Sequence, residues 1–420
     1  MKILMVSYSG YGAWFTLRLQ EEGHKVDYYL MSKDYMDVLH GLAPKPIFER
    51  PDFARYDLVL FDLTGKPKLA EKSALLTPTI GDGNFNSLVE EDRMFGIESM
   101  EQCDINVPPY EVFHEIGEAK KYIKANKKRY VFKPDGGQEQ DCNTTYVADS
   151  SQDLLDYIDR LGQATKGATF LLQEVVDGIE VSTEAYFNGE DFYLWNATLE
   201  EKKFMEGNKG PNTGCAGNLV WIYNKPNRLI EEGLMRMKDF LKHVGYRGMI
   251  DLNVIAGPDK LYGLEWTPRF GYDASATLCA LITSDLGEFF RAIAAGETPT
   301  TLRWNENAFA AATRLSIPPY PTEVHGKHPI GVPINGIDIE DISHGCYLYD
   351  AMLAGDELVT AGASGFIAVP IGVGRTTDEA WAVVKEKIKK IKIPDMQFRQ
   401  DLARRTWKRY EGLARWGWFK

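Results

Sequence analysis

Short apolar runs separated by one amphipathic stretch dominate the first eighty residues. Residues 2–8 and 57–63 are continuous apolar runs, as expected of strands that are buried on both faces. Between them, residues 13–23 are amphipathic and end in a glycine, and residues 25–31 predict a second strand. A further strand is predicted over residues 77–82. This β-α-β order predicts a small open α/β sheet.

The middle of the chain alternates between helical and strand patterns up to about residue 300. Helices are predicted over residues 87–102, 115–128, 151–161, 227–243 and about 275–295. Strands of β-branched and aromatic composition are predicted over residues 129–134, 144–147, 169–176, 179–187, 191–199, 248–255 and 261–266. Residues 205–218 are polar and rich in glycine, which predicts a loop.

The pattern changes after residue 300, where three prolines at positions 318, 319 and 321 mark a seam. Short strands are expected around Gly345, 361–365 and 369–374, followed by a helix over 376–391. The basic, aromatic tail has helical spacing, which predicts a docking helix with a solvated basic face. We therefore expect three regions, namely an N-terminal domain (1–105), a central domain (106–300) with one lobe at about 115–178, and a mixed C-terminal domain (301–420).

Composition narrows the class of protein. The 420 residues carry a net charge of −12, which argues against a dedicated nucleic-acid binder. Five cysteines with no CxxC spacing make a disulfide framework or a zinc site unexpected. No run of 18 apolar residues is present and the N-terminus reads as a strand, so we expect a cytoplasmic protein whose partners are small molecules.

A glycine-rich turn, Gly10-Tyr11-Gly12, follows the first predicted strand. Backbone N–H groups in such a turn can approach a phosphate at the start of a helix. Phe15 stands where a full GxGxxG pattern would have glycine, so the signal is weak. The turn either contacts substrate through Gly10 and Gly12 or is a plain tight turn.

Two carboxylates occur in consecutive predicted strands, Asp251 after Gly-Met-Ile and Glu265 after Tyr-Gly-Leu. Hairpin pairing would place both side chains on one face of a sheet. Two carboxylates that face one site repel each other unless a cation lies between them, and Mg²⁺ prefers oxygen ligands. Arg269 follows closely and could reach a phosphate group. The alternative is a hairpin with solvated acids.

Two further segments have residue types and positions that could bind a nucleotide. Lys133 ends an apolar strand just before a glycine-rich loop, where it could contact a phosphate group, although an exposed lysine at a strand end is the alternative. Residues 171–176 form an apolar strand that leads into a hinge, where backbone groups could read an adenine edge. Glu180 follows, and its carboxylate could bind ribose hydroxyls.

In this order, the segments resemble the ATP-grasp superfamily and, more narrowly, the phosphoribosylamine–glycine ligase (glycinamide ribonucleotide synthetase) family. Residues 210–214 read GPNTG, which matches the substrate loop of that family. Residues 264–271 (LEWTPRFG) stand where the family has EFNxRFG, and residues 177–182 (DGIEVS) match DGEEAS. The resemblance implies an α/β fold with a preATP-grasp open sheet, a two-lobed ATP-grasp region and a C-terminal mixed α/β domain.

The resemblance also implies an activity, in which ATP phosphorylates a carboxylate and an amine then attacks the acyl phosphate to give an amide, ADP and phosphate. The implied ATP-binding residues are Arg93, Lys133, Gly136, Gly137, Glu174, Val176 and Glu180. The implied ligands for Mg²⁺ or Mn²⁺ are Asp251, Glu265 and Thr267. The implied catalytic residues are Arg269, Asn212 and Thr213. Gly10, Gly12, Gly210, Pro211 and Gly214 would contact the amine-bearing substrate.

The sequence also departs from the family pattern. The first turn reads SGYGAWFT instead of GGREHA, Thr267 replaces a metal-binding asparagine, and residues 136–142 have two acids in place of a lysine. These departures predict a changed amine acceptor. Glycine is the default carboxylate, and the acceptor is phosphoribosylamine or another amine. The alternatives are a ligase that joins an amino acid to an unrelated amine, and a catalytically silent nucleotide-binding protein.

Overall fold

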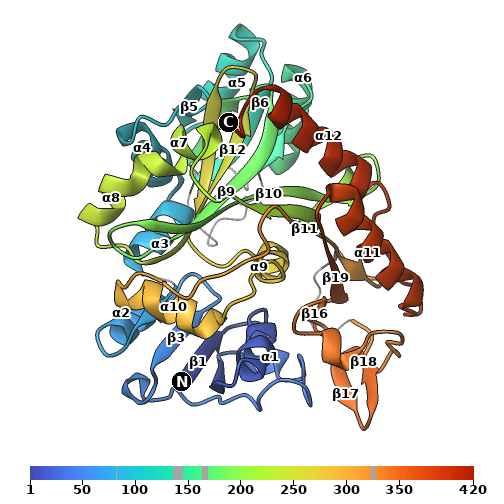
Figure 1. Ribbon diagram of the computed structural model, residues 1–420. Helices are drawn as coiled ribbons and strands as arrows, with labels where there is room; N and C mark the ends of the chain where they lie inside the picture. Colours follow the sequence, from blue (N-terminus) through green and yellow to red (C-terminus); the bar gives the residue numbers. More distant parts are fainter. Residues whose placement is uncertain (82, 136–144, 163–168, 323–327) are drawn as a thin grey trace.

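The computed structural model describes residues 1–81, 83–135, 145–162, 169–322 and 328–420 (Figure 1). Gly136 and Gly137, two of the predicted ATP-binding residues, lie outside these described residues. The fold is mixed α/β, as the sequence predicts. It contains a parallel N-terminal sheet, a smaller antiparallel sheet and one large sheet of nine strands.

The N-terminal sheet has four parallel strands in the order β2-β1-β3-β4. They are β2 (Lys25–Leu30), β1 (Lys2–Ser7), β3 (Leu58–Phe61) and β4 (Thr79–Ile80). Helices α1 (Ala13–Glu21) and α2 (Pro67–Ala74) connect them. Strands β1 and β3 are buried along nearly their whole length, which explains their uninterrupted apolar sequences.

The smaller sheet has an apolar core of its own, lined by residues such as Phe113, Phe132 and Phe170. Its four antiparallel strands are β5 (Tyr110–Phe113), β8 (Thr169–Glu174), β6 (Tyr130–Asp135) and β7 (Tyr146–Val147), in that order. Helices α5 (Ile116–Ala125) and α6 (Ser151–Leu161) complete it. Apart from β5, the elements of this unit lie within residues 115–178, and the division into lobes stays a prediction.

The large sheet joins the central and C-terminal parts of the chain. Its strands run in the order β13 (Leu261–Thr267), β12 (Gly248–Ala256), β9 (Ile179–Phe187), β10 (Phe192–Met205), β11 (Lys209–Ile222), β14 (Phe309–Thr313), β19 (Phe366–Gly374) and β15 (Leu315–Ser316), and β16 (Cys346–Leu348) also pairs with β19. Because β11 pairs directly with β14, the domain boundary predicted at residue 300 does not coincide with a break in the sheet.

Helices cover both sides of this sheet. Helices α11 (Thr377–Lys390) and α12 (Leu402–Arg415) lie along one side (Figure 1). Helices α3 (Asn84–Glu91) and α4 (Arg93–Gln102) pack against β13, and α9 (Tyr272–Cys279) packs against β11. Helix α10 (Leu286–Ala295) packs between the large sheet and the N-terminal sheet. Across the described ranges, no helix combines the length and the apolar character that crossing a membrane requires.

Three predicted helices are interrupted in the structure. The stretch 87–102 breaks at Asp92, which is extended and whose carboxylate accepts from the N–H of Phe95 at 2.9 Å to cap α4. The stretch 227–243 breaks at Gly233, between α7 (Arg228–Glu231) and a 3-10 turn that precedes α8 (Lys238–His243). The stretch 275–295 is also two helices, because the side chain of Asp285 caps α10.

The predicted loop over 205–218 was wrong. Strands β10 and β11 form a long antiparallel hairpin that turns at residues 206–208. Gly207 and Gly210 have positive φ values of 69° and 78°, so glycine suits this turn and the irregular pairing beside it. The glycines therefore belong to a hairpin and do not end the two strands.

The basic tail does form a docking helix, α12, but its basic residues are not all solvated. Glu201 of β10 has a side chain that is 1% exposed, and it contacts three arginines of the tail. Arg405 Nε lies 2.6 Å from Glu201 Oε2, and Arg409 Nη1 lies 2.9 Å from Oε1. Arg399 Nη1 lies 3.6 Å from Glu201 Oε2. The periodicity alone did not show which arginines face inward.

We predict that Glu201→Gln destabilises the fold, because it leaves three arginines beside a neutral side chain. The free energy of unfolding should fall by about 3 kcal/mol, as for other disrupted buried ion pairs. Glu411→Gln is the matched control, since Glu411 pairs with Arg415 at 3.8 Å on the exposed side of the same helix. Urea denaturation measures both variants, and equal effects would contradict the prediction.

Candidate active site

One face of the large sheet is lined with polar side chains, because polar residues alternate with apolar ones along four strands. The polar set is Glu180, Ser182 and Glu184 on β9, Asp251 and Asn253 on β12, Glu265 and Thr267 on β13, and Thr198, Glu200 and Lys202 on β10. The intervening residues, such as Val181 and Leu252, belong to the apolar core on the other face. Period-two alternation therefore builds a charged surface on a single sheet.

The predicted metal ligands lie on this face. Across the β12–β13 pair, Asp251 is opposite Thr267, and Asn253 is opposite Glu265. The prediction that hairpin pairing places Asp251 and Glu265 on one face is therefore confirmed. Their role as metal ligands stays a prediction.

Positive and negative charges meet at the polar face. Lys202 Nζ lies 2.7 Å from Glu180 Oε1 and 4.0 Å from Glu265 Oε1. Burial opposes ionisation of Glu180, but Lys202 and the amide of Asn253 hold its pKa at about 2. Glu265 is likewise kept ionised, since its pKa is lowered by Lys202, Lys133 and Arg93 against the effect of desolvation. Its side chain is 50% exposed, so water and ligands can reach it.

Lys133 lies on β6 of the smaller sheet and is only 6% exposed. Burial, with a smaller contribution from the nearby Arg93, lowers the pKa of its ammonium group to about 8, while Glu265 and Glu180 oppose the shift. The predicted phosphate-binding lysine is therefore a buried group and not an exposed strand end. It faces the same carboxylates as Lys202.

Asp251 offers a carboxylate oxygen with no partner. Its Oδ2 accepts from the hydroxyl of Ser182, but the buried Oδ1 makes no hydrogen bond. Glu184 is directly opposite on β9, and burial together with this neighbour raises the pKa of Asp251 well above its usual value. Burial also raises the pKa of Glu184 to about 7. Facing carboxylates with an unpartnered oxygen fit a hard divalent cation, so the residues present suit Mg²⁺ or Mn²⁺.

A cavity of about 140 Å³ opens between α3, α4 and β13. Four predicted residues, Arg93, Glu265, Thr267 and Arg269, line it together with Glu90. Arg269 Nη2 lies 2.8 Å from Glu90 Oε1, and Nε lies 2.9 Å from the same atom. Arg93 begins α4 and donates from Nε to the carbonyl of Pro134 at 3.1 Å, which joins this cavity to the strand of Lys133.

The predicted adenine hinge lies at the end of β8. Glu174 Oε1 is 2.5 Å from Lys128 Nζ, and the N–H of Glu174 donates to the carbonyl of Pro109 at 2.7 Å. Val176 follows in the short connection to β9. The segment thus connects the smaller sheet, which carries Lys133, to the strand that carries Glu180.

The GPNTG residues form the first part of β11. Gly210, Pro211, Asn212 and Gly214 are exposed, and Asn212 is paired with Lys203. Thr213 Oγ1 donates to the carbonyl of Lys202 at 3.0 Å, and Arg314 Nη1 donates to the carbonyl of Thr213 at 2.9 Å. The stretch is therefore attached to the strand that carries Lys202, at the border of the polar face.

The Gly10–Gly12 turn is already bonded within the protein. The N–H of Gly10 donates to Ser7 Oγ at 2.9 Å, and the N–H of Gly12 donates to the carboxylate of Asp62. A Cβ atom on Gly12 would overlap the side chain of Met5, so close packing requires glycine there. The structure gives the turn this packing role, and substrate contact by Gly10 and Gly12 stays a prediction.

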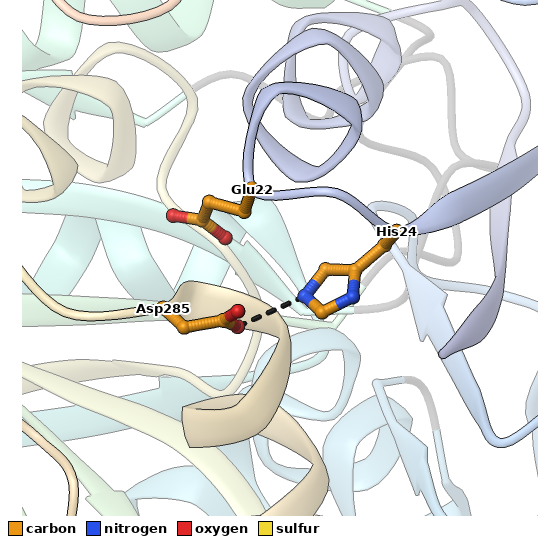
Figure 2. A group of neighbouring side chains, drawn as sticks. All are labelled: Glu22, His24 and Asp285. Carbon is orange, nitrogen blue, oxygen red and sulfur yellow. Dashed lines mark hydrogen bonds and ion pairs between the residues drawn. The ribbon is translucent and has the colours of Figure 1, made fainter.

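Another group of metal-ligating residue types, Glu22, His24 and Asp285, lies outside the polar face (Figure 2). Its atoms already bond within the protein. His24 Nε2 lies 2.9 Å from Asp285 Oδ1, and Glu22 pairs with Arg18 at 2.7 Å and accepts from the N–H of Leu286. The group fastens α1 and β2 to the start of α10.

Sequence reasoning missed Lys202, Glu90, Glu184 and Asn253. Three of them could have been found from the alternation of polar residues along 180–184, 200–202 and 251–253. Glu90 has no such signal, because it reaches Arg269 only through the packing of α3 on β13.

Comparison with known proteins agrees with this geometry. Residues 91–273 match the ATP-grasp (A) domain of phosphoribosylglycinamide synthetase. The matched region holds every polar-face residue described above, and it includes both the smaller sheet and β9 to β13.

Curated relatives and solved structures extend the resemblance beyond this region. The phosphoribosylamine–glycine ligase of Streptococcus pneumoniae is 23% identical over 330 residues, which is 75% of each chain. That of Halalkalibacterium halodurans is 25% identical over 331 residues, 75% of this chain and 74% of the relative. The crystal structure of the Thermotoga maritima phosphoribosylamine–glycine ligase has a TM-score of 0.75 at 19% identity and covers 96% of this chain and 100% of its own.

The ATP-grasp fold is also found in proteins with other names. The biotin carboxylase of Campylobacter jejuni, solved as a complex with a β,γ-ATP compound, has a TM-score of 0.67 at 13% identity and covers 94% of this chain and 92% of its own. At these identities the structural likeness establishes the fold.

We predict that Glu184 makes stability fall as pH rises. Its folded pKa of about 7 lies above the usual range, so its contribution is complete below about pH 4 and is lost as pH rises through 7. In metal-free buffer, Glu184→Gln should therefore be more stable than wild type at pH 8 by roughly 2 kcal/mol and similar at pH 5.

Urea unfolding at the two pH values measures this difference. Glu190→Gln is the control, because Glu190 is exposed and pairs with Lys242. A Glu184→Gln variant whose advantage is the same at both pH values would contradict the titration of this group.

Proposed function

We propose that the protein is an ATP-dependent carboxylate–amine ligase of the phosphoribosylamine–glycine ligase type. The observation that carries the proposal is the meeting of Lys133, Arg93 and Lys202 with Glu265 on the polar face of an ATP-grasp fold. Three cations beside metal-binding carboxylates suit the triphosphate of a nucleotide. The names of the relatives support the type of ligase.

Each charged group has a proposed role. Lys133 and Arg93 bind phosphate oxygens of ATP, and the same role is proposed for Gly136 and Gly137. Glu180 binds ribose hydroxyls next to the adenine hinge at Glu174 and Val176. Asp251, Glu265 and Thr267 hold Mg²⁺ or Mn²⁺, which neutralises phosphate charge when bound. One of these three ligands, Thr267, offers only a neutral hydroxyl, so the two carboxylates contribute most of the affinity for the cation.

The chemistry needs positioning and charge neutralisation more than a covalent nucleophile. A carboxylate oxygen of the substrate attacks the γ-phosphorus and ADP leaves. The amine then attacks the acyl phosphate, phosphate leaves, and the amine loses a proton. Arg269, oriented by Glu90, steadies the transferred phosphoryl group. Asn212, Thr213 and the neighbouring GPNTG glycines contact the amine-bearing substrate.

The carboxylate is proposed to be glycine and the acceptor phosphoribosylamine. A second candidate acceptor, a different amine, is supported by the first turn. There the amides of Gly10 and Gly12 are bonded internally, and the turn lacks the arginine, glutamate and histidine of the GGREHA pattern.

The test is ADP release with Mg²⁺, glycine and phosphoribosylamine generated in situ, each omitted in turn. Release that needs both substrates would support the first acceptor, and release that needs another amine from a panel would support the second. ATP binding without ADP release under any condition would instead identify a catalytically silent protein.

We predict that Glu265→Gln abolishes metal-dependent ADP release, because an amide is a poorer ligand for Mg²⁺ than a carboxylate. The fold should stay intact, since the side chain is half exposed. Circular dichroism and ADP release measure the two effects. A folded variant with wild-type turnover would falsify the metal assignment.

We also predict that nucleotide affinity falls as pH rises above 8. The pKa of Lys133 is about 8, and only its charged form attracts a phosphate. The Kd of a fluorescent ATP analogue should rise by up to about tenfold per pH unit above that value. Lys133→Arg keeps its charge throughout this range, so its profile should be flat. A wild-type profile as flat as that of the arginine variant would exclude Lys133 from the phosphate site.

A further inference from the structure

Arg409, on the C-terminal helix α12, bridges the backbones of two strands of the active site. Its Nη1 donates to the carbonyl of Glu200 on β10 at 2.6 Å and to Glu201 Oε1 at 2.9 Å. Its Nη2 donates to the carbonyl of Glu180 on β9. One guanidinium group therefore satisfies acceptors on both strands.

The bridge lies where the pairing of these strands ends. Strands β9 and β10 are paired up to Ser182 and Thr198, and Glu180 and Glu200 each lie two residues beyond that last pair. Glu180 is still paired with Ile255 of β12 and Glu200 with Asn218 of β11, but between β9 and β10 the connection at this level is made by the guanidinium group of Arg409. Arg409 thus replaces ladder hydrogen bonds at this point.

The other face of the same strands carries the charged pair of the active site. Lys202 Nζ lies 2.7 Å from Glu180 Oε1 on this face, whereas Arg409 pairs with Glu201, whose side chain alternates to the opposite face. Because Arg409 fixes the carbonyls of Glu180 and Glu200, it sets the separation of the strands from which the side chains of Glu180 and Lys202 extend.

Helix α12 is itself held firmly. Thr406 accepts from the indole N–H of Trp381 at 3.1 Å, and Trp418 donates to the carbonyl of Gly257 at 2.8 Å. Gly412 faces Ile179 so closely that a Cβ atom there would clash with that side chain. The helix therefore presents Arg409 to the sheet from a fixed position.

We propose that Arg409 is a positioning residue for nucleotide binding, acting through Glu180 and Lys202. This inference rests on the proposed function, in which Glu180 binds the ribose. It assigns to the C-terminal helix a part in recognising the ribose hydroxyls, although the helix itself lies on the opposite face of the sheet.

The test compares ATP with 2′,3′-dideoxy-ATP in the full-length protein, by calorimetry with Mg²⁺. Wild type should bind ATP about tenfold more tightly than the dideoxy compound, because a charged carboxylate accepts hydrogen bonds from the hydroxyls. In Arg409→Gln this discrimination should be lost, and ATP should bind about as weakly as the dideoxy compound. Arg409→Lys, which keeps a charge beside Glu201 but cannot span both carbonyls, should lose most of it.

Arg405→Gln is the matched control, since Arg405 contacts the same carboxylate of Glu201 at 2.6 Å and makes no contact with the carbonyl of Glu180. It should lower the melting temperature as much as Arg409→Gln does and keep the ribose discrimination. Full discrimination in folded Arg409 variants, or its equal loss in Arg405→Gln, would overturn the role of Arg409. A wild-type protein that binds neither nucleotide would overturn the proposed function, and this inference with it.

Discussion

A single large sheet must present charge on one face and bury apolar side chains on the other, and the rest of the structure depends on this constraint. Strands β9, β10 and β12 alternate strictly enough that Glu180, Ser182 and Glu184 face the site while Val181 and Ala185 enter the core. A shift of one residue in pairing would exchange the two faces. The register of these strands therefore determines whether the carboxylates and lysines meet at all.

Some of the charged side chains on that face form ion pairs, and others, among the residues described, do not. Lys202 holds Glu180 and Glu265 in their ionised forms, whereas Asp251 and Glu184 face each other without an ion pair among the residues described. Lys133 is a cation in the opposite situation, because burial disfavours the charged form of its ammonium group. Such strained groups are common where a ligand supplies the missing charge. The half of the face near Asp251 suits a cation, and the half near Lys133 suits an anion.

Much of the fold could be predicted, because apolar periodicity reports burial directly. The strand at 179–187 and the helix at 151–161 have the predicted bounds, and Asp251 and Glu265 share a face as hairpin pairing requires. The predictions failed for two different reasons. Asp92 and Asp285 interrupt helices by capping the next one, a local signal that apolar periodicity does not report. Arg409 and Glu90 join the site through contacts that are distant in the sequence, and no local pattern encodes those contacts.

The pairing of β11 with β14 has a consequence for how the molecule can be divided. Leu219 and Trp221 of β11 lie on the strand that β14 covers, and β14 follows the boundary predicted at residue 300. A fragment that ended at that boundary would leave an open edge of unpaired N–H and C=O groups beside a large apolar surface, which is a template for aggregation. The part of the chain after residue 300 therefore cannot be exchanged as a separable module, because its strands continue the same sheet.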